Sequence, residues 1–380
     1  MMKKKKVLFV VEAMGGGVRR HIVDLIKWLD KEQFEIMLLY GEKRADDAFN
    51  SSINELSKMA TLKKSSYLVR EIDIKADIKA IKEAKQVIKE FKPDIVHCHS
   101  SKAGVIGRYA AKRLGVKKIY YTPHAYSFQK DNFSRKKRLL FIKIERWFSK
   151  YATTMTFNVS NCEKNEALRN NIDSFDKFKV IYNGISDYNK NGGYSIKSEL
   201  GLDKDSLIVG VASRLDSQKE PFVFVKIAKM VIEKIPNVHF VYVGDGPLFD
   251  EIRKYVFESG IDKNVHLLGF RNDVQSIVKD FDLFLFTSLN ESMPYCLIES
   301  LCAGVPIVAT KVMGNDEVVI PGLNGELFEA GNVQKGFETV CNMLDNKDKY
   351  SYQKIRSDFM DRFLIDKMIN AIQGVYLDNY

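Results

Sequence analysis

The stretch Phe281-Asp-Leu-Phe-Leu-Phe-Thr-Ser-Leu-Asn-Glu-Ser-Met-Pro-Tyr-Cys-Leu-Ile-Glu299 contains a short apolar run, a polar loop and a second apolar segment. The first run predicts a buried strand, and Pro294 predicts the start of a helix. Glu291 and Glu299 therefore follow a strand, where a parallel α/β sheet binds its ligand. Carboxylates accept hydrogen bonds from the hydroxyl groups of sugars and ribose. The alternative interpretation is a solvated glutamate and a glutamate favoured by a helix dipole.

Strands and helices alternate along the rest of the chain, which predicts parallel sheets. Strands are predicted at Val7–Val11, Glu35–Tyr40, Asp94–His99, Lys118–Thr122, Thr153–Val159, Leu207–Ala212, His239–Val243, Val265–Leu268, Leu283–Phe286, Pro306–Ala309 and Gly325–Phe328. The polar, glycine-rich segment 186–193 predicts a linker. The expected fold class is α/β, with two doubly wound Rossmann-like domains that face a cleft.

Composition and charge narrow the function classes. The 380 residues are 45% hydrophobic and 28% charged, enough for two folded domains. Residues 1–190 contain 39 Lys and Arg against 22 Asp and Glu, whereas residues 191–380 contain 20 against 27. This asymmetry predicts a polyanionic partner for the first half. Five cysteines without a Cys-x-x-Cys motif argue against disulfides and a zinc cluster, and favour a reducing cytoplasm.

A predicted helix over residues 134–150 combines basic and apolar side chains. It begins with Arg135, Lys136, Lys137 and Arg138 and continues with leucine, isoleucine, tryptophan and phenylalanine. This composition is typical of an interfacial helix on an anionic membrane. The alternative is a helix that packs its apolar side on the sheet and solvates the rest. Nucleic acid is disfavoured as the polyanion because no recognition module is recognisable.

Three glycines, Gly15, Gly16 and Gly17, separate the first strand from the first helix. Glycines there let the backbone approach a ligand, and the helix N-terminus offers N–H groups to an anion. The dinucleotide fingerprint requires a third glycine where this chain has Arg20. The alternative is a simple tight turn.

Arg214 and Lys219 follow the strand Leu207–Ala212, and Gly244-Asp-Gly246 follows the next strand. Two cations five residues apart suit a diphosphate, because Arg offers a fork and Lys a point charge. The alternative is a solvated pair of loop charges. Both loops follow strands of the same predicted sheet and lie at the same edge as Glu291, which favours a binding site there.

His99 and His124 end neighbouring strands in the first half. An imidazole beyond a sheet edge can donate to a hydroxyl or a phosphate. We expect His97 to point to the opposite face from His99 and to belong to the core. No suitably placed carboxylate completes a metal site with these three, so no metal is expected.

Taken together, the chain resembles the retaining glycosyltransferases of family four, which have the GT-B fold. The resemblance spans nearly the whole length and rests on a set of motifs: Gly16-Gly17…His21, Asp94-Ile-Val-His-Cys-His99, Val180-Ile-Tyr-Asn-Gly-Ile185, Ser213-Arg-Leu215 with Lys219, Gly244-Asp-Gly246 and Glu291-x7-Glu299. It implies an acceptor-binding domain over residues 1–185, a nucleotide-sugar-binding domain over 186–351, and C-terminal helices over 352–380 that cross back to the first domain. Two departures are Glu220, where glycine is usual, and Met313 before Gly314, where the family often has two glycines.

The resemblance also implies roles for the site residues. Arg214 and Lys219 would bind the donor diphosphate, Glu299 the ribose and Glu291 the transferred sugar. His124 would lie near that sugar. The remaining donor contacts would be Gly16, Gly17, Gly244, Met293, Pro294, Tyr295 and Cys296. His99 and Lys102 are expected on the acceptor side.

The expected reaction moves a hexose, N-acetylhexosamine or deoxyhexose from a nucleotide-diphosphate sugar, with UDP favoured, to a lipid-linked saccharide in cell-surface polysaccharide (capsule) biosynthesis. We expect retention by front-face attack, no metal cofactor, and a cytoplasmic enzyme held peripherally on the inner face of the cell membrane. Alternatives are a nucleotide-sugar 2-epimerase of the same fold, an NAD oxidoreductase, and a non-enzymatic basic scaffold that binds membranes.

Overall fold

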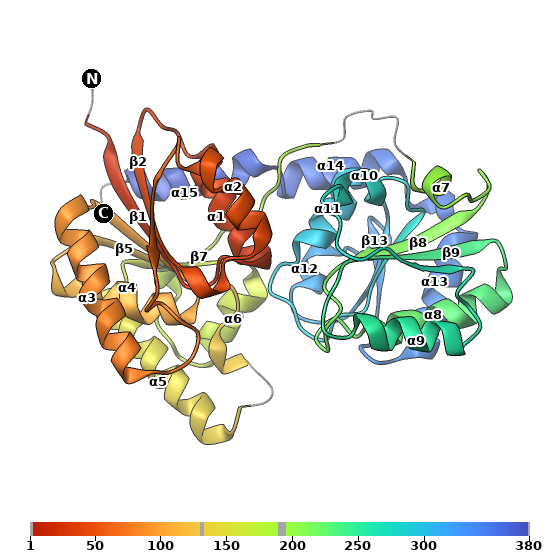
Figure 1. Cartoon of the computed structure of the whole chain (residues 1–380), viewed down its shortest axis with the longest axis horizontal. Helices are drawn as coiled ribbons and strands as arrows, with labels where there is room; N and C mark the ends of the chain where they lie inside the picture. Colours follow the sequence, from red (N-terminus) through yellow and green to blue (C-terminus); the bar gives the residue numbers. More distant parts are fainter. Residues whose placement is uncertain (1–2, 130–132, 189–194, 379–380) are drawn as a thin grey trace. The chain divides into compact units, whose positions relative to one another are not determined.

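The chain forms two compact units in a computed structural model that describes residues 3–129, 133–188 and 195–378 (Figure 1). The first unit comprises residues 1–183 and 366–380, and the second comprises residues 184–365. Residues 189–193 of the predicted linker lie outside the described residues. The division differs from the expected one at the C-terminus. Helix α14 (Tyr352–Arg362) belongs to the second unit, and only α15 (Ile365–Leu377) joins the first.

The first unit contains a seven-stranded parallel sheet in the order β3-β2-β1-β4-β5-β6-β7. Its strands are β1 (Lys5–Val11), β2 (Phe34–Gly41), β3 (Thr61–Ser65), β4 (Ile95–His99), β5 (Lys118–Thr122), β6 (Met155–Asn158) and β7 (Phe178–Val180). Its other α-helices are α1 (Gly16–Trp28), α2 (Asp47–Leu56), α3 (Ile74–Phe91), α4 (Ser101–Arg113), α5 (Arg135–Ala152) and α6 (Asn161–Arg169).

Helices cover both faces of this sheet. Alternate strand residues such as Leu8, Val96 and Cys98 pack with α3, α4 and α5 on one face. The other face receives α15, whose Tyr376 ring stacks 5.4 Å from the Tyr120 ring. Tyr120 also donates its hydroxyl to the carbonyl of Val375 at 3.1 Å. These contacts attach the C-terminal helix to the first sheet.

The second unit contains a six-stranded parallel sheet in the order β10-β9-β8-β11-β12-β13. Its strands are β8 (Leu207–Ala212), β9 (Val238–Val243), β10 (Val265–Leu267), β11 (Leu283–Phe286), β12 (Ile307–Thr310) and β13 (Gly325–Phe328). Its other α-helices are α7 (Ile196–Glu199), α8 (Pro221–Lys234), α9 (Phe249–Glu258), α10 (Val274–Val278), α11 (Tyr295–Ala303), α12 (Asn315–Val318) and α13 (Val333–Asp345).

The strand order reverses once in each sheet. β1 pairs with both β2 and β4, and β8 pairs with both β9 and β11. Ligands of such sheets bind beyond the carboxyl ends of the strands at these switch points. The prediction of two doubly wound α/β units is confirmed, and each unit has one such edge. In the described part of the chain, no helix combines the length and apolarity that a bilayer span requires.

Candidate functional site

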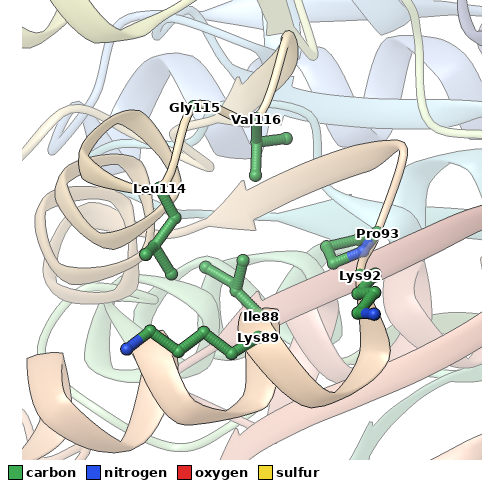
Figure 2. A pocket seen from close by; sticks show the side chains of 7 residues that line it. All are labelled: Ile88, Lys89, Lys92, Pro93, Leu114, Gly115 and Val116. Atoms are coloured by element: carbon green, nitrogen blue, oxygen red, sulfur yellow. The ribbon is translucent and has the colours of Figure 1, made fainter.

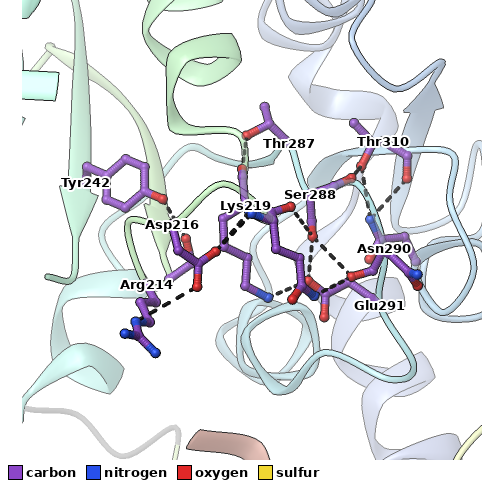
Figure 3. A network of polar contacts seen from close by, with 12 residues as sticks. Arg214, Asp216, Lys219, Tyr242, Thr287, Ser288, Asn290, Glu291 and Thr310 are labelled. Atoms are coloured by element: carbon purple, nitrogen blue, oxygen red, sulfur yellow. Dashed lines mark hydrogen bonds and ion pairs between the residues drawn. The ribbon is translucent and has the colours of Figure 1, made fainter. Parts of the chain in front are cut away.

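The loops after β8 and β11 are tied to each other at the switch point of the second sheet (Figure 3). The hydroxyl of Thr287 donates to the carbonyl of Lys219 at 2.8 Å. The amide of Leu289 donates to the carbonyl of Gln218 at 2.8 Å, and the Gln218 side chain donates to the carbonyl of Asn290 at 2.6 Å. The backbone positions of Lys219 and Glu291 are therefore fixed relative to each other.

Lys219 and Glu291 form an ion pair at this position. Their side chains are only 19% and 10% exposed, and the Ser288 hydroxyl donates to the same Glu291 oxygen at 2.6 Å. Burial is the largest single influence and lowers the pKa of Lys219, but the charge and hydrogen bond of Glu291, together with weaker interactions such as that with Asp216, raise the pKa above its ordinary value. Lys219 is therefore a fixed positive charge beyond the end of β8.

Arg214 provides a second cation on the same loop, but its side chain is exposed, whereas that of Lys219 is mostly buried. Its side chain is 69% exposed, and its Nε lies 3.9 Å from the Asp216 carboxylate. Figure 3 shows its guanidinium pointing away from the Lys219–Glu291 pair. Because this side chain is long and exposed, it can turn towards an anion without breaking a buried contact.

The N-terminus of α11 adds backbone donors to this edge. Pro294 occupies the N-cap, and no side chain caps the helix there. The first N–H groups of an α-helix lack partners within the helix and favour an anion. Burial raises the pKa of the Cys296 thiol well above its ordinary value, so this cysteine is a neutral group and not a nucleophile.

Two glycines permit close contacts between the loops. Gly244 has φ +145°, and a Cβ atom there would lie 1.9 Å from the carbonyl oxygen of Ser213. Gly314 has φ +85°, and its Cβ would lie 2.7 Å from the backbone of Ser292. Gly314 thus lets two backbone segments pass close to each other beside Glu291. Met313, which stands where the family often has a second glycine, does not prevent this contact.

The glycine-rich loop of the first unit is already occupied by a carboxylate. Asp46 accepts a hydrogen bond from the amide of Gly16 at 3.3 Å and pairs with the Arg19 guanidinium at 3.1 Å. The anion position at the N-terminus of α1 is therefore filled by the protein itself. This arrangement disfavours a dinucleotide phosphate there, and donor contacts by Gly16 and Gly17 stay predictions.

Three histidines meet at the carboxyl edge of the first sheet. His21 comes from α1, His99 from the end of β4 and His124 from the loop after β5. The ring centres of His21 and His124 lie 4.8 Å apart, and His99 Nδ1 lies 3.1 Å from His124 Nε2. Burial lowers the pKa of His21 to about 4 and lowers the pKa values of His99 and His124 well below their ordinary value. All three rings are therefore neutral near pH 7.

The prediction that His97 points away from His99 is wrong. Residues two apart on a strand share a face, and the two rings lie 4.0 Å apart. The expectation that His97 is buried holds. Its two ring nitrogens pair with the hydroxyls of Tyr376 at 2.6 Å and Thr122 at 2.8 Å.

The residues expected on the acceptor side are less accessible than the sequence suggested. His99 is fully buried. Lys102 pairs with Asp77 and donates to the carbonyl of Glu71 at 2.8 Å. The structure therefore gives neither residue a free polar surface, and their acceptor roles stay predictions.

Comparisons with known proteins agree with this arrangement. The family described as "Glycosyltransferase Family 4" matches residues 15–187, and "Glycosyl transferases group 1" matches residues 195–357. A protein of Escherichia coli named UDP-Gal:alpha-D-GlcNAc-diphosphoundecaprenol alpha-1,3-galactosyltransferase is 31% identical over 373 residues, which is 96% of this chain and 94% of that protein. The chain belongs to glycosyltransferase family 4.

Solved structures have the same fold as this glycosyltransferase. Anabaena HepE, solved with UDP and glucose, superposes with a TM-score of 0.78 at 20% identity and covers 98% of this chain and 99% of its own. The lipopolysaccharide outer core galactosyltransferase WaaB has a TM-score of 0.72 at 20% identity, with coverage of 98% and 99%. The two Rossmann-like units are therefore those of a GT-B glycosyltransferase.

Helix α5 of the glycosyltransferase presents an exposed face that is both basic and apolar. Arg135, Lys136, Lys137 and Arg138 are all exposed in its first turn. Leu140 and Trp147 are 55% and 48% exposed, and Leu139 and Tyr151 are similarly uncovered. On the opposite side, Ile142 and Phe148 are buried in the first unit. The helix thus packs one apolar stripe against the first unit and exposes a second apolar stripe to solvent.

A pocket of about 380 Å³ lies at the other edge of the first sheet (Figure 2). It is bounded by the end of α3 with Pro93 and by the end of α4 with Val116. These segments precede β4 and β5, so the pocket is at the amino ends of the strands. It is therefore at the opposite end of the first sheet from the three histidines.

Proposed function

We propose that this glycosyltransferase retains the anomeric configuration and transfers a hexose, N-acetylhexosamine or deoxyhexose from a nucleotide-diphosphate sugar, with UDP favoured, to a lipid-linked saccharide. The observation that carries the proposal is the Lys219–Glu291 pair at the switch point of the second sheet. The printed name of the Escherichia coli relative, with its UDP-sugar donor and diphosphoundecaprenol acceptor, supports both substrate classes.

The second unit binds the donor. Negative charge grows on the β-phosphate as the sugar departs, and fixed cations stabilise that charge best. Lys219 is already in place, and Arg214 turns in from its exposed position. The uncapped N-terminus of α11 adds N–H groups for the phosphate or the sugar. Because these groups supply the positive charge, the proposed transfer needs no metal.

Glu291 and Glu299 divide the recognition of hydroxyl groups. Glu291 holds the transferred sugar and Glu299 the ribose. Glu291 carries a second duty because it fixes Lys219. Retention follows from front-face attack, in which the leaving phosphate accepts the proton of the acceptor hydroxyl.

The first unit binds the acceptor. Helix α5 holds the enzyme on the anionic inner face of the cell membrane. Each basic residue near such a surface contributes about 1 kcal/mol of attraction. The exposed Leu139, Leu140 and Trp147 would enter the interface beside these charges. A lipid-linked acceptor would then reach the enzyme by lateral diffusion, in a pathway of surface-polysaccharide (capsule) synthesis.

Vesicle flotation tests the membrane part. Vesicles with anionic lipid should retain the chain, and changing Arg135, Lys136, Lys137 and Arg138 together to Glu should release it. A matched variant that reverses the exposed residues Lys226, Lys229, Lys254 and Lys335 of the second unit should still bind. Equal binding by both variants would contradict the role of α5.

A further inference from the structure

We propose that His21, His99 and His124 form a binding site for one divalent transition-metal ion of the zinc class. The three side chains come from α1, β4 and the loop after β5, so the fold and not the local sequence brings them together. One ring nitrogen from each lies within 4.8 Å of the others. The inference concerns the first unit alone and does not depend on the proposed transfer reaction.

The spacing of the nitrogens is close to that of a metal site. His99 Nδ1 and His124 Nε2 are 3.1 Å apart. Two imidazole nitrogens bound to tetrahedral zinc at 2.0–2.1 Å are roughly 3.3 Å apart. Two of the three ligands are therefore at ligand spacing, and movement of the His21 ring by about 1.5 Å brings in the third.

The His21 ring is oriented by a partner in the manner of a metal ligand. Its Nδ1 lies 3.2 Å from the side-chain oxygen of Asn183, which can only accept a hydrogen bond. Nδ1 therefore carries the proton, and Nε2 keeps its lone pair. Metal-bound histidines commonly donate their second nitrogen to an oxygen in this way.

Two nitrogens of the cluster lack a partner among the described residues. His21 Nε2, the proposed ligand atom, is buried and makes no hydrogen bond there, and neither does His99 Nε2, which lies across the ring from the Nδ1 that faces His124. Nearly all buried polar side-chain atoms have a partner, so such atoms need an explanation. His97 differs because both its nitrogens are paired.

The donor set selects the class of ion. Neutral imidazoles suit zinc, copper, nickel and iron, whereas magnesium and calcium require oxygen ligands. Three protein ligands leave one tetrahedral position for water or a small ligand. The expectation of no metal site considered His97, His99 and His124 and found no carboxylate to complete them, whereas the proposed site has His21 in place of His97.

Cobalt titration of the full chain, purified without an affinity tag and treated with a chelator, tests the site. Cobalt(II) should bind with one equivalent, give the visible absorption of a tetrahedral ion, and be displaced by zinc. X-ray absorption of the zinc form should show three imidazole nitrogens at 2.0–2.1 Å. Failure to bind one equivalent, or a shell of oxygen ligands, would overturn the proposal.

Variants identify the ligands. His21→Gln and His99→Gln should abolish the cobalt spectrum, and Asn183→Ala should weaken cobalt binding roughly ten- to a hundredfold. His266→Gln is the matched control, because His239 and His266 of the second unit also lie 3.1 Å apart. Loss of the spectrum in His266→Gln, or its persistence in His21→Gln, would overturn the assignment. Melting curves without metal show whether each variant folds. If the histidine variants do not fold, cobalt binding by Asn183→Ala and X-ray absorption of the wild-type zinc form test the site instead.

Discussion

At the carboxyl edge of the second sheet, Lys219 and Glu291 form a charged pair, whereas the same edge of the first sheet gathers His21, His99 and His124 as neutral rings. Both edges lie at a reversal of strand order in a parallel sheet. The two units thus share a topology and differ in the chemistry at its functional edge.

In the proposed function, this difference lets one architecture bind two kinds of ligand. In the proposed function, the ligand of the second unit is a charged nucleotide diphosphate, which a cation held by a carboxylate would bind. The first unit has neutral rings at the histidines and carries a group of exposed basic residues on α5. Charge at the second edge should therefore control catalysis, and protonation at the first edge should control stability.

The largest expected effect follows from removing the fixed cation. Lys219→Ala should lower kcat roughly 10²- to 10³-fold, because it removes the preorganised charge that, in the proposed function, stabilises the leaving phosphate. It also leaves Glu291 without its partner, which should lower the free energy of unfolding by about 3 kcal/mol. Steady-state kinetics and denaturant unfolding measure these changes. Lys226→Ala, an exposed lysine on α8, should change neither.

The two glutamates should respond differently. Glu291→Gln should mainly lower kcat, because Glu291 pairs with Lys219 and, in the proposed function, also holds the transferred sugar. Glu299→Gln should mainly weaken nucleotide affinity, by about 1–3 kcal/mol, through the lost ribose contact. Calorimetry with UDP and initial-rate kinetics separate the two. Loss of all activity in both variants with nucleotide binding intact would favour acid–base roles instead.

Acid should destabilise the first unit more than the second. Burial holds the pKa of His21 at about 4, below its ordinary value of 6.5, so the unfolded chain binds a proton that the folded chain does not. The stabilisation is complete above pH 6.5 and falls as the pH drops towards 4, by about 3 kcal/mol for this residue. His97, His99 and His124 shift in the same direction.

Hydrogen exchange at pH 5 and pH 7, with a chelator present, measures this loss in each unit separately. His239 and His266 also have lowered pKa values, but they are only partly buried and should contribute less. Equal protection of the first unit at both pH values would contradict the account of the histidines.

The smallest expected effect concerns the departure at Glu220. This residue has φ +50° at the start of α8, a conformation that costs a residue with a Cβ roughly 1–2 kcal/mol. Glu220→Gly should therefore raise the free energy of unfolding by about 1 kcal/mol. Thermal unfolding measures the change in stability. Lys226→Gly is the control: Lys226 is exposed and has an ordinary helical conformation, so glycine there should lower the stability.

Most of the fold could be predicted because buried parallel strands are nearly continuous apolar runs. β3 (Thr61–Ser65) was missed because its sequence, Thr-Leu-Lys-Lys-Ser, is an edge strand with polar side chains. Lys219 and Glu291 were placed at one sheet edge because each follows its own strand directly.

Other parts of the site could not be predicted from local sequence. The approach of His21 to His99 depends on how α1 packs over β4. Asp46 fills the N-terminus of α1 from a loop thirty positions further along the chain. Both are long-range contacts, which spacing and periodicity do not encode.

Transfer in a defined mixture tests the central claim most directly. The chain is incubated with polyprenyl-diphosphate-linked N-acetylglucosamine and, in separate reactions, with UDP-, GDP-, dTDP- and ADP-sugars. The mass of the lipid product is measured by mass spectrometry. The account predicts that one donor, with UDP favoured, adds a single sugar to the lipid and that Lys219→Ala nearly abolishes the product while Lys226→Ala does not. Equal product from Lys219→Ala and wild type would contradict it.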